Sequence, residues 1–122
     1  MSEVRNLHKR AMALVKESNE AKDSENYKAA NDLLKEALAI ESEAAMKLYS
    51  NFAAEPTRSV LFRSAATIAY NCEDYETAER MVYCGLSSNN VPLEIKEELD
   101  KIKTELNTIT TLDNDSVKAY NY

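Results

Sequence analysis

Apolar residues recur at alternating steps of three and four through most of the chain, a spacing that places them on one side of an α-helix. Short polar breaks and two prolines separate the periodic stretches. The stretches predict five helices: residues 3–22, 26 to about 52, 56–72, 75–86 and 91–109. Because the chain also has one Gly, two Pro and no long β-branched run, we expect an all-α fold.

The stretch from Ser59 to Asn90 is patterned by side-chain size as well as by polarity. Small residues recur where two helices would have to approach closely, and large apolar residues lie between them. The small residues are Ala65, Ala66, Ala69, Ala78 and Gly85, and the large ones are Phe62, Ile68, Tyr75, Met81 and Leu86. The pattern predicts a tightly packed helical hairpin that stacks on other helices. The wide apolar arc of its first helix predicts cover on more than one side.

The breaks contain residues that end one helix and begin the next. In the polar segment 22–26, Asp23 or Ser24 is the expected N-cap of the second helix, and Asp74 is the expected N-cap of the fourth. Pro56 ends the second helix and belongs in the first turn of the third. The second helix is therefore predicted to be about 40 Å long and to overhang the first.

The fifth helix carries one narrow apolar stripe, formed by Ile95, Leu99, Ile102, Leu106 and Ile109. A single stripe predicts a single covered side. The periodicity is lost after Ile109. We therefore expect one domain at residues 1–110 and a flexible C-terminal tail at 111–122.

Charge is unevenly distributed over a chain whose net charge is −6. Residues 1–22 hold five Lys or Arg against three Glu, whereas the remainder holds ten against eighteen Asp or Glu. An acidic body is a poor partner for phosphate backbones, so we expect no nucleic-acid binding. Charged residues interrupt the apolar runs near the N-terminus, and no run is long enough to span a membrane, so the predicted location is cytoplasmic.

Side chains typical of catalysis or metal binding are few. His8 is the single histidine, and Cys72 and Cys84 lie in different predicted helices without a second ligand at metal-binding spacing, so both are expected to be reduced thiols. Glu41 and the other clustered glutamates are expected among solvated charges. A chain with one glycine has no Gly-rich phosphate loop. We predict no catalytic residues, no metal and no cofactor.

A short motif occurs twice. Asn26-Tyr27-Lys28-Ala29-Ala30 aligns with Asp74-Tyr75-Glu76-Thr77-Ala78, 48 positions later. Here the chain resembles the tetratricopeptide repeat (TPR), whose helix pairs carry small residues at fixed places and a Gly-Asp-Tyr type of turn. The matching positions are Phe62, Ala66, Ala69, Glu73-Asp74-Tyr75, Ala78 and Gly85, and more loosely Leu14, Ser18, Ala21, Asn26-Tyr27, Ala30 and Ala37.

The resemblance covers residues 11–90 and implies a right-handed stack of two antiparallel hairpins, closed by the fifth helix as a C-terminal capping helix. The chain departs from the family at several positions. Glu25 and Glu73 replace the turn glycine, and Asn90 stands where proline is usual. The spacing of 48 exceeds the roughly 34 residues of the family, and we assign the excess to an elongated second helix.

The resemblance also implies a concave face lined by the first helix of each pair. Carried over by position, the candidate partner-binding residues are Lys16, Asn19, Lys22, Arg63, Thr67, Tyr70 and Asn71. The last four also stand out without the resemblance, because they follow the polar side of an otherwise apolar helix and suit an extended or acidic peptide. The alternative interpretation is a solvated face on which Arg63 pairs with a neighbouring Glu.

The predicted function is that of a non-enzymatic scaffold whose concave face binds a peptide or helix of another protein. The alternative is a self-assembling, homodimeric structural or regulatory subunit. Two hairpins are fewer than such stacks usually need, and a second copy could cover the exposed ends. The apolar seam at Leu99 and Ile102, or the edge of the second helix, would then form the dimer contact.

Overall fold

The computed structural model describes residues 2–120, with side chains described as far as Ile109, and this part of the chain contains helices and no strand. The helices are α1 (Ser2–Asp23), α2 (Tyr27–Lys47), α3 (Thr57–Asn71), α4 (Tyr75–Leu86) and α5 (Leu93–Tyr120), with a short 3₁₀ helix η1 (Phe52–Ala54) between α2 and α3. The predicted all-α fold with five helices is confirmed.

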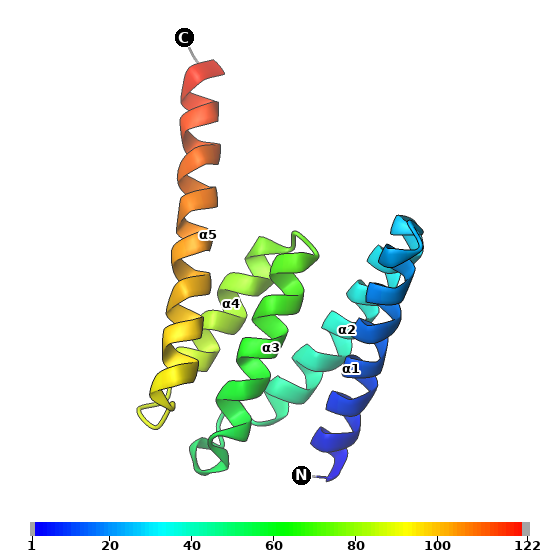
Figure 1. Ribbon diagram of the computed structural model, residues 1–122. Coiled ribbons are helices and arrows are strands. Elements are labelled where there is room, and N and C mark those ends of the chain that lie inside the picture. Colours follow the sequence, from blue (N-terminus) through cyan, green and yellow to red (C-terminus); the bar gives the residue numbers. More distant parts are fainter. Residues whose placement is uncertain (1, 121–122) are drawn as a thin grey trace.

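The helices form two stacked hairpins followed by a long single helix (Figure 1). Helix α1 pairs with α2, and α3 pairs with α4. The second hairpin lies between the first hairpin and α5, because α2 packs against α3 on one side while α5 packs against α3 and α4 on the other. In the view of Figure 1 the two hairpins spread apart towards their turns.

Both hairpin turns have the same backbone geometry. Glu25 and Glu73 adopt left-handed conformations with φ of 61° and 60°. In the first turn, Asn26 N–H donates to the Ala21 carbonyl at 2.8 Å, and Glu25 N–H donates to the Lys22 carbonyl at 2.9 Å. These are the two hydrogen bonds of a Schellman C-cap. The second turn repeats them at 2.9 and 3.0 Å.

The residue after each left-handed glutamate caps the next helix. The Asn26 side chain accepts a hydrogen bond from Ala29 N–H at 3.3 Å, and the Asp74 side chain accepts one from Thr77 N–H at 3.2 Å. The prediction for Asp74 is confirmed. The prediction of Asp23 or Ser24 as the first cap is wrong, because the Schellman turn places these residues before the left-handed position and moves the cap to Asn26.

Helix α2 is shorter than predicted. It ends at Lys47 and has 21 residues against the 22 of α1, so it does not overhang α1. The residues that lengthen the repeat lie instead in the connection from 48 to 56, which includes η1. Helix α3 begins at Thr57, so Pro56 is its N-cap residue and does not lie in its first turn as predicted.

Arg58 fixes this connection to the end of α4, and its side chain is fully buried. Its guanidinium donates hydrogen bonds to the carbonyl of Tyr49 at 3.0 Å, to the carbonyl of Cys84 at 2.8 Å and to the hydroxyl of Ser87 at 3.0 Å. One of its nitrogens lies 3.6 Å from a carboxylate oxygen of Glu55. The positive charge therefore satisfies backbone carbonyls at the C-terminus of α4, where the helix dipole favours a cation.

The predicted close approach of helices is observed around Gly85. A Cβ atom built there would lie 3.0 Å from Leu99 Cδ1 and 3.0 Å from Phe62 Cβ, so α3, α4 and α5 meet at this residue. The four alanines of the small-residue pattern have no exposed surface: Ala65, Ala66, Ala69 and Ala78. The prediction that size is constrained in this hairpin is therefore confirmed.

Helix α5 covers the second hairpin with the predicted stripe. Ile95, Leu99 and Leu106 are buried, and Ile102 is half-buried against the same core. The helix continues to Tyr120, past the predicted domain end at residue 110. The backbone of 111–120 is therefore helical. The side chains of 111–122 lie outside the described residues, so the flexibility predicted for this segment stays a prediction. Within the described part of the chain, no helix is long and apolar enough to cross a membrane.

Candidate functional site

A groove of about 560 Å³ lies between the first hairpin and α3. Three helices supply its lining: Met12, Val15, Ser18, Asn19 and Lys22 from α1; Tyr27, Ala30, Asn31 and Leu34 from α2; and Arg63, Ser64, Thr67, Ile68 and Asn71 from α3. Its lining includes Lys22, Tyr27 and Asn71, which lie near the hairpin turns, and Figure 1 shows the two hairpins spreading apart towards these turns. The hairpin geometry therefore leaves the groove open between α1 and α3.

Five of the residues predicted from sequence line this groove: Asn19, Lys22, Arg63, Thr67 and Asn71. The other two do not. Lys16 is exposed on α1 outside the lining, and Tyr70 is half-buried with its ring edge-to-face against Tyr75, at 5.8 Å between centroids. The side chain of Tyr70 therefore belongs to the contact between α3 and α4.

The lining from α2 was not predicted. Tyr27, Asn31 and Leu34 contribute to the groove, although the resemblance assigned the concave face to the first helix of each pair alone. Tyr27 is 58 % exposed, which is more than its position in the repeat motif suggests. The equivalent Tyr75 of the second hairpin packs against Tyr70, so the two tyrosines of the repeated motif have different surroundings.

The groove combines apolar side chains with amides, hydroxyls and two cations. Met12, Val15 and Leu34 are only partly buried and pack against the core. The hydroxyl of Thr67 donates to the carbonyl of Arg63 at 2.9 Å, so its hydrogen is already used within α3. Such a mixture of apolar surface and a few polar groups is typical of surfaces that bind peptides.

Arg63 connects the groove to α5. One of its terminal nitrogens lies 2.9 Å from a carboxylate oxygen of Glu98, and the two side chains are 31 % and 54 % exposed. The sequence-based alternative, in which Arg63 pairs with a glutamate, is thus what the structure shows in the free chain. The same residue also lines the groove, so the two interpretations are compatible.

His8 and Glu41 form a polar contact between α1 and α2. Nδ1 of His8 lies 2.8 Å from one carboxylate oxygen of Glu41 and 3.0 Å from the other, and the Glu41 side chain has no exposed surface. The prediction that Glu41 lies among solvated charges is wrong, because position 41 falls on the apolar side of α2, between Leu38 and Ala44. The pair joins α1 to α2.

Neither cysteine forms a disulfide, in agreement with the predicted free thiols. The pKa of Cys72 is raised by burial and by the nearby carboxylate of Asp74, with Lys35 opposing. Burial also raises the pKa of Cys84, with Arg58 and Arg80 opposing. Both thiols are therefore protonated at neutral pH and are weak nucleophiles. Among the described residues, no group of three or more His, Cys, Asp or Glu could hold a metal ion.

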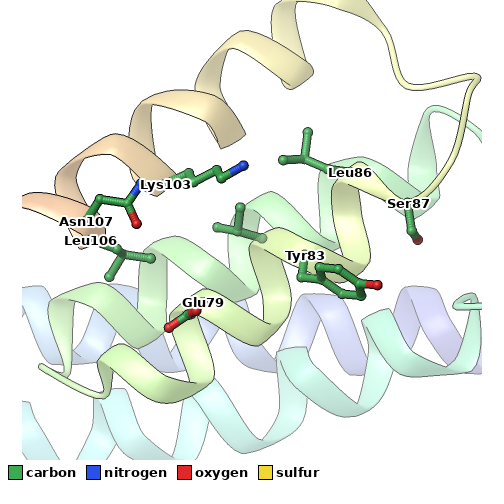
Figure 2. Close-up of a pocket in the computed structure, with 8 residues that line it drawn as sticks. Glu79, Tyr83, Leu86, Ser87, Lys103, Leu106 and Asn107 are labelled. Atoms are coloured by element: carbon green, nitrogen blue, oxygen red, sulfur yellow. The ribbon is translucent and has the colours of Figure 1, made fainter. Parts of the chain in front are cut away.

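A second pocket, of about 460 Å³, lies between α4 and α5 (Figure 2). Val82 and Leu106, which line it, are buried, whereas Tyr83 is 72 % exposed. Figure 2 shows Tyr83 and Leu86 on α4 and Lys103 on α5 around this space. One acid and one base line the pocket, Glu79 and Lys103, so it has no excess of either charge.

Comparisons with family models, with curated protein sequences and with solved structures found no match to this chain.

Proposed function

We propose that this chain is a non-enzymatic protein-interaction module whose groove between the first hairpin and α3 binds a peptide or helix of another protein. One observation supports the proposal most directly. Residues 12–34 and 63–71 converge on a single groove of about 560 Å³ that carries both apolar and hydrogen-bonding side chains. The tightly packed helices around Gly85 hold α3 in place, so the groove is formed before a partner arrives.

Site-specific photo-crosslinking in the native cell tests this proposal. A photoreactive benzoylphenylalanine replaces Thr67, which is exposed on the α3 side of the groove. We expect a crosslink to a defined segment of one partner, and we expect Asn19→Trp on the opposite wall to abolish it by filling the groove. The control position is Glu43, which is exposed on α2 and does not line the groove. The same crosslinks from positions 67 and 43, or crosslinks that survive Asn19→Trp, would contradict the proposal.

Self-assembly is the second candidate, and the pocket between α4 and α5 supports it. The exposed Tyr83 ring beside the buried side chains of Val82 and Leu106 would suit a contact with a second copy. The seam expected from sequence is less suitable, because Leu99 has no exposed surface and packs inside its own chain. Sedimentation velocity should then show a dimer that Tyr83→Glu dissociates. A monomer at every concentration would reject this candidate.

A further inference from the structure

The groove differs in charge from the rest of the molecule. Asp and Glu make up 21 of the 122 residues, yet none of the described residues that line the groove is acidic. The charged residues in the lining are Lys22 and Arg63. In a chain with a net charge of −6, the charged side chains of the groove lining are therefore all cationic, and they attract negatively charged groups.

The polar groups of the groove are available for binding. Among the described residues, no hydrogen bond is formed by the side chains of Asn19, Asn31 or Asn71, and no ion pair by Lys22. Each amide can both donate and accept a hydrogen bond, which suits the backbone of a peptide. The two cations favour peptides with hydrogen-bond acceptors such as carboxylates, because a lysine ammonium and an arginine guanidinium donate hydrogen bonds and accept none.

Arg63 already holds one carboxylate. Its contact with Glu98 is a single ion pair of 2.9 Å between partly exposed side chains. Ion pairs of this kind contribute little to stability, so another carboxylate can displace Glu98 at small cost. Glu98 reaches Arg63 from α5 and does not itself line the groove.

We propose that the groove binds an acidic segment of its partner and that Glu98 competes with the carboxylates of that segment for Arg63. The inference rests on the proposed function of the groove and specifies the chemistry of its occupant. Arg63 leaves Glu98 when the segment binds, so α5 lowers the affinity of the groove in the free chain. The neutral pocket between α4 and α5 has no comparable selectivity.

Selected peptides test this inference. Twelve-residue peptides are selected by phage display on the full chain, labelled with fluorescein and measured by anisotropy. Each is also synthesised with its Asp and Glu replaced by Asn and Gln. We expect Arg63→Gln and Lys22→Gln each to weaken binding roughly 3- to 10-fold, and Glu98→Gln to strengthen it roughly 2- to 4-fold. Matched controls are Arg5→Gln, Lys9→Gln and Glu97→Gln, at exposed positions outside the groove.

The double variant Arg63→Gln/Glu98→Gln isolates the competition. If Glu98 acts through Arg63, the gain from Glu98→Gln disappears when Arg63 is absent. A gain that persists, or selected peptides whose affinity is unchanged by the amide replacement, would overturn the inference while leaving the groove as a peptide-binding site. If Asn19→Trp blocks none of the peptides, or if no peptide is selected, the proposed function itself fails and the inference fails with it.

Discussion

The two hairpins have the same Schellman turn between their helices. The left-handed residues of these turns, Glu25 and Glu73, have φ angles of 61° and 60°. Their interiors differ. Helices α1 and α2 also bury alanines such as Ala11 and Ala37, and they are joined in addition by polar contacts, such as the 2.7 Å hydrogen bond from the Ser18 hydroxyl to the Ala30 carbonyl and the His8–Glu41 pair. Helices α3 and α4 are joined by alanines and Gly85 at close approach, and their polar link is Arg58, which donates to the Cys84 carbonyl near the end of α4.

The position of each hairpin in the stack explains this difference. The second hairpin is covered on two sides, by α2 and by α5, so small residues are needed wherever three helices meet. The first hairpin has a packing neighbour on one side, where α2 contacts α3, and the groove opens on that same side between the first hairpin and α3. The repeated turn therefore determines the shape of each hairpin, while the helices packed against it determine which side chains fit in its interior.

Replacement of Arg58 by Met should have the largest effect on stability. It removes the donors to Tyr49 and Cys84 and leaves buried carbonyl groups without partners, which we expect to lower the free energy of unfolding by about 3–5 kcal/mol. Urea denaturation followed by circular dichroism measures the loss. The control, Arg63→Met, changes a partly exposed arginine of the same helix and should cost less than about 1 kcal/mol. Equal stability of the two variants would contradict the role assigned to Arg58.

His8→Ala should have the next largest effect and tests the polar contacts of the first hairpin. The buried carboxyl group of Glu41 loses its hydrogen-bond partner, which should cost about 2–3 kcal/mol in the same denaturation experiment. Adding Glu41→Leu should recover most of this loss, because an apolar residue suits the buried position. If the double variant is no more stable than His8→Ala, the loss comes from the helix surface and not from the pair.

Gly85→Ala tests the close packing of the second hairpin. Helix propensity alone would favour Ala by about 1 kcal/mol. The new methyl group, however, would lie 3.0 Å from Leu99 and from Phe62, and overpacking of this kind costs about 1–3 kcal/mol. We expect a net loss of about 1 kcal/mol, measured by thermal or urea denaturation. A variant more stable than the natural chain would show that the three helices can move apart freely.

The periodicity of apolar residues was enough to predict the helices and the hairpin packing, because burial on one side of a helix determines that pattern directly. It could not predict the buried charges. Arg58 and Glu41 occupy apolar-side positions, four residues before Phe62 and three residues before Ala44, and their partners come from distant parts of the chain. The groove was predicted only in part, because its α2 wall depends on how the hairpins spread.

Glycine at the two turns should have the smallest effect, and it should be stabilising. A left-handed glutamate costs about 1–2 kcal/mol, partly offset by the greater flexibility of glycine in the unfolded chain. We expect Glu25→Gly and Glu73→Gly each to raise the free energy of unfolding by about 0.5–1 kcal/mol, and by similar amounts because their φ angles match. The control, Glu17→Gly within α1, should destabilise by about 1 kcal/mol. If only one turn gains stability, the two turns are equivalent in backbone geometry and not in energy.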